Sequence, residues 1–135
     1  MILLDSSFIV AYSNEADGNH EKAFLEMENI EKGDYGSPTI TDYIFDEVTT
    51  VILVKTRNLK RAVDLGEKLL SATILFRVDG DVFYLAWKLF KEQRELKFSF
   101  TDCTSIALCK TNGISNIATF DRDFKTLLDF KTIGL

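Results

Sequence analysis

Two short segments, each followed by an aspartate, constrain the fold of this chain most strongly. The continuous apolar run from Met1 to Leu4 leads directly into Asp5, and the segment from Ile114 to Phe120 leads into Asp121. A continuous apolar run of this kind is typical of a parallel strand that is covered on both faces. The two segments therefore predict buried strands, each with a carboxylate at its carboxyl end.

Segments with helical periodicity lie between and beside these strands. We expect helices over 20–31, 42–55, 59–71 and 82–95 and from Asp102 to Gly113, short helical turns over 8–12 and 124–128, and further strands over 35–37, 73–77 and 131–133. Strands that alternate with helices predict an α/β domain with a mostly parallel sheet of four or five strands and helices on both faces. The 135 residues, 46% of them hydrophobic, have the size of a single globular domain.

Composition and charge exclude several classes of protein. No apolar run approaches the roughly 20 residues of a membrane span, and the first residues lack the basic region of a signal peptide, so we expect a cytoplasmic protein. Cys103 and Cys109 have neither metal-ligand spacing nor a geometry that closes a disulfide, which predicts that they are buried apolar residues. A net charge of -5 argues against a general nucleic-acid coating protein. It still allows a metal-dependent enzyme that acts on nucleic acid, because bound cations offset acids at the site.

A third acid is expected to face the core from the start of a helix. On a helix capped by Ser99 or Thr101, Asp102 lies on the same side as Ile106. A simpler interpretation is a capping box, Ser99-x-x-Asp102, with Asp121 as a turn residue. The residues alone leave both interpretations open.

A fourth acid, Glu47, falls within the apolar arc of the helix predicted over 42–55. Asp42 and Asp46 on the same helix are expected to point to solvent. Glu47 can also be explained as a side chain at the edge of the arc that reaches water.

Four carboxylates, Asp5, Glu47, Asp102 and Asp121, are therefore expected to meet at the carboxyl edge of the sheet, where α/β proteins place their functional crevice. Carboxylates brought together without Lys or Arg partners repel one another and take up protons unless hard cations bind between them. Such a site suits metal-assisted hydrolysis of phosphodiester bonds.

The segments that carry these acids resemble the PIN domain nucleases, and within them the short VapC-like toxin ribonucleases. The matching segments are Ile2-Leu-Leu-Asp5-Ser-Ser, Thr41-Asp-Tyr-Ile-Phe-Asp-Glu-Val, Phe100-Thr-Asp102-Cys-Thr-Ser-Ile-Ala-Leu and Ile117-Ala-Thr-Phe-Asp121-Arg-Asp-Phe. Together they span essentially the whole chain in the order and spacing of the family. The resemblance implies one PIN-like domain over 1–135 with a three-layer α/β/α sandwich.

The same resemblance implies the chemistry of the site. It suggests an endoribonuclease that binds Mg²⁺ or Mn²⁺ through the four acids, and a small antitoxin protein as its partner. Ser6 and Thr101 match small hydroxyl positions that support the acid pocket, and Asp123 matches an accessory acid that varies within the family.

Other readings of strand-end acids fit less well. A phosphate-accepting receiver domain requires adjacent acids after the first strand, and a haloacid-type phosphatase requires Asp-x-Asp there, where this chain has Asp5, Ser6 and Ser7. A housekeeping PIN nuclease and a PIN-like module that binds RNA or protein without cutting remain as alternatives. The presence of all four acids argues against a module that binds without cutting.

Positive and aromatic residues suggest where partners bind. Lys55, Arg57, Lys60 and Arg61 form one candidate RNA-binding cluster, although such a cluster can equally be a solvated face. A second basic cluster near 88–97 is interleaved with acids. Phe83, Trp87 and Phe90 are more large apolar residues than a chain of this size can cover, which predicts a homodimer.

Overall fold

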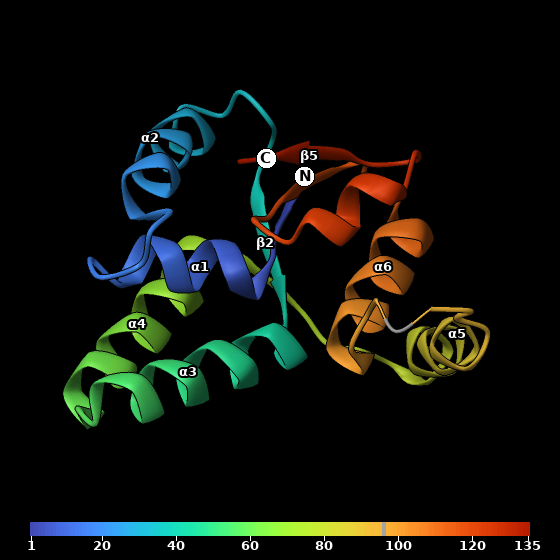
Figure 1. The fold of residues 1–135 in the computed structure, drawn as a ribbon, viewed down its shortest axis with the longest axis horizontal. Coiled ribbons are helices and arrows are strands. Elements are labelled where there is room, and N and C mark those ends of the chain that lie inside the picture. Colours follow the sequence, from blue (N-terminus) through green and yellow to red (C-terminus); the bar gives the residue numbers. More distant parts are fainter. Residues whose placement is uncertain (96) are drawn as a thin grey trace.

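A parallel sheet forms the centre of the molecule (Figure 1). The computed structural model describes residues 1–95 and 97–135, and within them five strands form one sheet in the order β3-β2-β1-β4-β5. The strands are β1 (Ile2–Leu4), β2 (Pro38–Thr41), β3 (Ile74–Phe76), β4 (Asn116–Ala118) and β5 (Lys131–Ile133). The chain begins in the middle of the sheet, moves outward to β3, and returns past β1 to β4. The site can therefore form between β1 and β4, where the direction of winding changes.

The register of β1 fixes the carboxyl edge of the sheet. Ile2, Leu3 and Leu4 are all buried, as expected for a central strand covered on both faces. Leu4 pairs with Ala118 of β4, and the next amide, that of Asp5, still donates to the Ala118 carbonyl at 2.9 Å. Asp5 is thus held at the end of the strand by the sheet itself.

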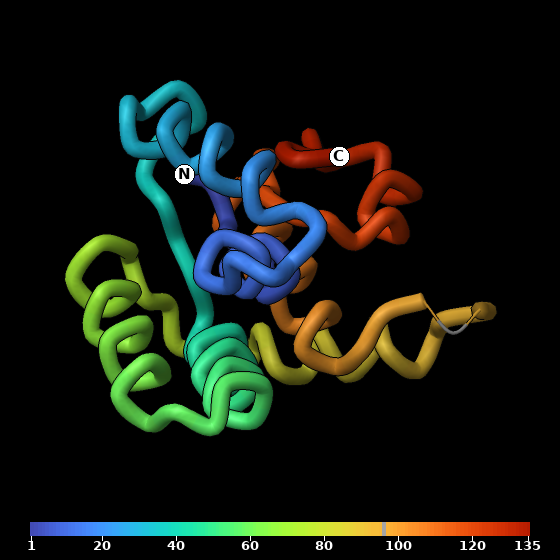
Figure 2. The backbone as a smooth tube through the Cα atoms, turned by 60° about the vertical axis from the view of Figure 1, so that its left-hand side comes forward, coloured from blue at the N-terminus to red at the C-terminus, as the bar shows by residue number. Residues whose placement is uncertain are grey.

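Helices lie on both sides of the sheet. They are α1 (Ser6–Ser13), α2 (His20–Glu31), α3 (Asp42–Thr56), α4 (Leu59–Ala72), α5 (Gly80–Lys91) and α6 (Phe100–Asn112), and a 3-10 turn, η1 (Arg122–Thr126), precedes β5. In Figure 1, α1, α2 and α4 lie to the left of β2 and α5 and α6 to the right. Helices α3 and α4 pack against each other, as do α5 and α6 (Figure 2). The predicted α/β class and three-layer arrangement are confirmed.

Side-chain caps start several helices at the carboxyl edge of the sheet, among them α1, α3 and α6. The Asp5 side chain caps α1, Thr41 caps α3 by accepting the Ile44 amide at 3.0 Å, and Ser99 caps α6. Gly113 ends α6 with φ 65°, a left-handed conformation that glycine adopts without strain. These caps place the first turns of α1, α3 and α6 beside one another.

Several predicted boundaries were wrong. The strand expected over 35–37 lies at Pro38–Thr41, where Pro38 occupies the first strand position, one that does not require its missing amide. The helix expected over 82–95 ends at Lys91, and the strand expected over 114–120 is only Asn116–Ala118. Asp42, expected to point to solvent, is half-buried and accepts the Val78 amide at 3.0 Å.

The two cysteines are buried and free, as predicted. Among the residues that the structure describes, no helix combines the length and apolar character needed to cross a membrane.

Candidate active site

Asp5 is the most deeply placed of the four acids. Only 4% of its surface is exposed, and its Oδ2 accepts hydrogen bonds from Ser7 Oγ at 2.7 Å and Thr119 Oγ1 at 2.9 Å. Burial raises the pKa of Asp5 above its usual value, because the charged form is poorly solvated, and the two hydroxyl groups oppose that rise. The hydroxyl groups therefore make a buried carboxylate tolerable at this position.

The backbone after β4 orients these two hydroxyl groups. Ser7 Oγ accepts the Phe120 amide at 3.0 Å, and Thr119 Oγ1 accepts the Asp121 amide at 3.0 Å. Because each oxygen accepts an N–H, its own proton is available to Asp5. The hydrogen bonds that the Ser7 amide, the Ser7 hydroxyl and the Thr119 hydroxyl donate to the Asp5 side chain all go to Oδ2.

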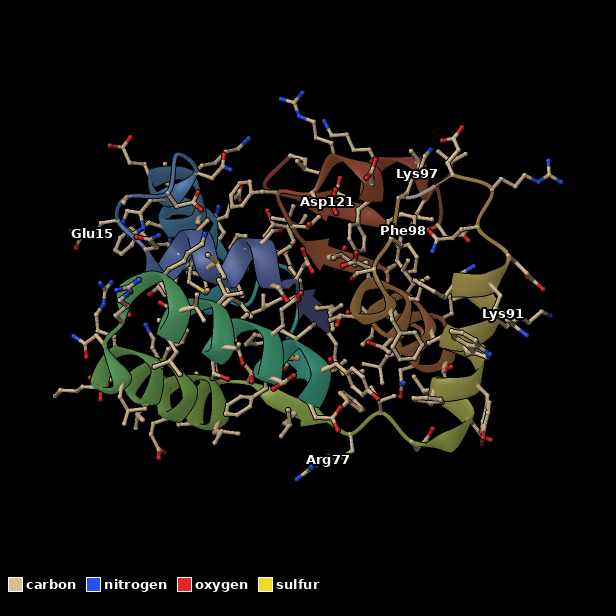
Figure 3. The ribbon with its side chains drawn as sticks, turned by 60° about the horizontal axis from the view of Figure 1, so that its bottom comes forward. Glu15, Arg77, Lys91, Lys97, Phe98 and Asp121 are labelled. Carbon is tan, nitrogen blue, oxygen red and sulfur yellow. The ribbon has the colours of Figure 1, made fainter. Side chains whose placement is uncertain are left out.

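Asp121 follows β4 and caps η1 (it is labelled in Figure 3). Its Oδ1 accepts the Asp123 amide at 2.9 Å, and its own amide is bound to Thr119. Asp123 thus supports Asp121 through its backbone rather than its carboxylate. The same Thr119 hydroxyl connects Asp121 to Asp5 on the neighbouring strand.

Asp102 forms the capping box that was one of the two interpretations of its sequence position. It forms a capping box with Ser99, in which Asp102 Oδ2 accepts the Ser99 amide at 2.8 Å and Ser99 Oγ accepts the Asp102 amide at 3.1 Å. Burial raises the pKa of Asp102 to about 6, against the effect of the Ser99 amide, and the charges of Asp5 and Asp121 add to the rise. The helix cap therefore also belongs to the group of acids.

Glu47 comes to the site from α3. Ser6 Oγ donates a hydrogen bond to Glu47 Oε2, which links the first turn of α1 to α3. Glu47, Ser6 and Asp121 line one open cavity of about 400 Å³, together with Lys55. Glu47 is half-buried, so it faces this cavity rather than the centre of the core.

The other predicted residues make contacts of their own. Thr101 is half-buried on α6, where its carbonyl accepts the Thr104 hydroxyl at 2.6 Å. Lys60 forms an exposed ion pair with Asp64 at 2.8 Å, and Arg61 donates to the Ser13 carbonyl at 3.4 Å. Arg57 is exposed at the end of α3, in a left-handed conformation.

Sequence reasoning missed Ser7 and Thr119, the two hydroxyl groups that hold Asp5. A usable signal was present, because each lies two positions from a strand-end acid, Ser7 after Asp5 and Thr119 before Asp121. At that spacing a short hydroxyl side chain can reach a neighbouring carboxylate or amide.

The donor set suits a hard divalent cation, although the side chains are not closed around one. Within 1–95 and 97–135, no three His, Cys, Asp or Glu side chains stand close enough to form a ready metal-binding group. The ion pairs of these residues are Lys60–Asp64, Lys97–Glu95 and Lys110–Asp129, so none of the four acids is neutralised by a basic side chain. Carboxylate oxygens without such partners match the ligand preference of Mg²⁺ and Mn²⁺.

The fold and this group of acids place the protein in a known family. Residues 2–127 match the PIN domain family, and the chain belongs to that family. It is similar to the 23S rRNA-specific endonuclease VapC20 of Mycobacterium tuberculosis, with 27% identity over 128 residues that cover 92% of each chain. The predicted resemblance to VapC-like PIN proteins is confirmed.

Solved structures share the fold. The crystal structure of M. tuberculosis VapC20, described as a sarcin-ricin loop cleaving toxin, matches with a TM-score of 0.83 and 25% identity over 95% of each chain. VapBC2 from Rickettsia felis, bound to a DNA fragment from its promoter, matches with a TM-score of 0.74 and 15% identity over 98% of this chain and 97% of that one. A toxin-antitoxin complex from Klebsiella pneumoniae gives 0.69 and 17% with the same coverage. At such low identity, the last two support the fold alone.

Proposed function

We propose that this single-domain protein is a cytoplasmic, metal-dependent endoribonuclease and the toxin of a toxin-antitoxin pair. The observation that carries the proposal is the buried carboxylate of Asp5, held by Ser7 and Thr119 beside Asp102 and Asp121. Burying acids together costs stability, so their grouping needs a functional reason. Similarity to VapC20 supports RNA as the substrate and makes 23S rRNA the first molecule to test.

The four acids Asp5, Glu47, Asp102 and Asp121 are the residues that would hold the cation. Hydrolysis of a phosphodiester requires an activated water and neutralisation of charge on the leaving oxygen, which Mg²⁺ or Mn²⁺ supplies when bound. The chain's own contribution is to orient the acids. Ser7 and Thr119 fix Asp5 through one oxygen, and Ser6 fixes Glu47.

The test compares two neighbouring acids on α3. Glu47→Gln removes a charge that faces the acid-lined cavity, whereas Asp46→Asn removes an exposed charge one position away. We expect the wild type and Asp46→Asn to cleave 23S rRNA with Mg²⁺ or Mn²⁺, and Glu47→Gln to lose most of this activity. Cleavage that persists in EDTA, or equal rates for the two variants, would contradict the proposal.

The exposed aromatic face of α5 supports the proposed homodimer. Phe83, Trp87 and Phe90 are 38%, 44% and 37% exposed, and their rings gather around Phe100 of α6. Large aromatic residues that stay partly exposed on one face mark a contact surface. We expect Trp87→Ala to shift the protein toward monomer in sedimentation experiments. A wild type that is monomeric at all concentrations without antitoxin would exclude the dimer.

The proposed antitoxin partner is supported by the similarity to VapC20, whose solved structure is described as that of a toxin. Co-expression with the product of a small neighbouring reading frame, followed by co-purification, tests this part of the proposal. Absence of a binding partner encoded there would favour a housekeeping nuclease.

A further inference from the structure

A second cavity, of about 300 Å³, lies beside the one that Glu47 and Asp121 line. Three cations surround it: Lys22 from α2, and Arg122 and Lys125 from η1. Figure 2 shows the start of α2 near the C-terminal segment that contains η1, although the two are far apart in sequence. The sequence did not suggest this group, because its members come from opposite ends of the chain.

The two cavities share a wall. Asn19 and Phe120 line both of them, so a chain-like ligand can pass from one to the other across these two side chains. The Phe120 ring is held in place, since it stacks on Phe8 with ring centres 5.7 Å apart and Gly134 packs against its edge. A fixed, half-exposed aromatic ring at such a point can support a nucleotide base.

The cations of the second cavity are available to a ligand. Ion pairs in the described part of the chain engage Lys60, Lys97 and Lys110, but not Lys22, Arg122 or Lys125. All three are exposed, and among the described residues no Asp or Glu side chain lines their cavity. Exposed cations without partners attract the phosphates of a nucleic-acid backbone.

We propose that this cavity, lined by Lys22, Arg122 and Lys125, binds backbone phosphate of the RNA strand next to the bond that is cut. The inference rests on the proposed function in taking RNA as the ligand. A basic site at this position would bind the negatively charged RNA strand next to the acidic centre, which by itself repels RNA. Lys55 also lines the acid cavity, so the strand would meet a further cation beside Glu47 and Asp121.

Most of the residues that the sequence suggested for RNA contact do not line the acid cavity. Of the cluster Lys55, Arg57, Lys60 and Arg61, only Lys55 lines the acid cavity, and Lys60 is paired with Asp64. A double variant in that cluster therefore makes a charge-matched control.

The test measures binding without cleavage. A fluorescent single-stranded oligoribonucleotide is titrated in EDTA at several salt concentrations with the wild type, with Arg122→Ala/Lys125→Ala, and with Arg57→Ala/Lys60→Ala. Each lost phosphate contact lowers the slope of log affinity against log salt by about 0.7 for single strands, so we expect a fall of about 1.4 in the first variant and none in the control. Circular dichroism verifies that both variants are folded.

Each outcome decides between the two proposals. Equal slopes for the two double variants, or a wild type that does not bind the oligoribonucleotide, would overturn the phosphate site. A cleaving wild type with an unchanged slope in Arg122→Ala/Lys125→Ala leaves the nuclease proposal intact and removes only this inference. A reduced slope with no cleavage in Mg²⁺ or Mn²⁺ supports the phosphate site and contradicts the proposed activity.

Discussion

Replacing Asp102 by asparagine separates its capping role from its charge. The amide oxygen of asparagine can still accept the Ser99 amide, so most of the capping box survives. What is lost is a negative charge that burial disfavours and that Asp5 and Asp121 repel. In the absence of metal, we therefore expect Asp102→Asn to be more stable than the wild type at neutral pH.

The magnitude follows from the raised pKa. A difference of one pKa unit equals about 1.4 kcal/mol, so the rise from 3.8 to about 6 corresponds to at most about 3 kcal/mol. Because Asp102 is partly exposed, solvent screening reduces our expected value to about 1–2 kcal/mol. Because the pKa of Asp102 is raised in the folded protein, it is the wild type that loses stability as the pH rises from its unfolded pKa of 3.8 through about 6. The advantage of Asp102→Asn should therefore be absent at about pH 4 and fully present at about pH 8.

Metal should reverse the order of stability. The wild type gains RT ln(1 + [Mg²⁺]/Kd), about 2.7 kcal/mol at 100 times Kd, and a variant that lacks one ligand should lose most of that gain. The assay is denaturant unfolding of both proteins in EDTA and in excess Mg²⁺, at about pH 4 and about pH 8. Asp46→Asn, an exposed change, serves as the control and should alter stability by no more than about 0.5 kcal/mol.

Two results would refute this reasoning. One is an Asp102→Asn protein that is less stable than the wild type in EDTA at about pH 8, which would mean that its capping role outweighs its repulsion. The other is equal stabilisation of both proteins by Mg²⁺, which would remove Asp102 from the ligands.

Three further predictions concern the protonation of the acids and the residues around Thr119. The rate of RNA cleavage should rise as the pH passes about 6 and this rise should move to lower pH with more Mg²⁺, as pH-rate profiles at several metal concentrations would show. Thr119→Val removes the hydroxyl group shared by Asp5 and the Asp121 amide, and urea unfolding should show a loss of about 1–3 kcal/mol, with Thr119→Ser as the control that keeps the hydroxyl. Gly134→Ala should cost about 1–3 kcal/mol in the same assay, because Gly134 has φ 101° and a Cβ there would lie 3.0 Å from the Thr119 carbonyl oxygen. Gly80→Ala is the control and should show no such loss, because a Cβ at Gly80 would have no atom within 4 Å.

The sequence predicts the strand-end acids well for a physical reason. Short apolar runs between amphipathic helices admit few arrangements other than a parallel sheet, and the carboxyl ends of parallel strands meet at one edge. Asp5 and Asp121 therefore approach each other from neighbouring strands, β1 and β4. Local periodicity was also sufficient to direct Glu47 toward the site from α3.

Contacts that depend on strand order could not be predicted in this way. The hydroxyl group of Thr119 reaches Asp5 because Leu4 pairs with Ala118, and the sequence alone does not state which strands are neighbours. The same holds for Lys22 and Arg122, which share a cavity although they are about a hundred residues apart in the chain. Element boundaries, such as the end of α5 at Lys91, are set by tertiary packing rather than by propensity.

The link between Asp5 and Thr119 has a consequence for the newly synthesised protein. Thr119 leaves the ribosome more than a hundred residues after Asp5. Until β4 has been translated and has docked beside β1, the Asp5 carboxylate lacks the Thr119 hydroxyl and its strand lacks one of its two neighbours. We therefore expect ribosome-bound nascent chains and prematurely terminated products that lack β4 to have an incomplete site and to be inactive in RNA cleavage assays.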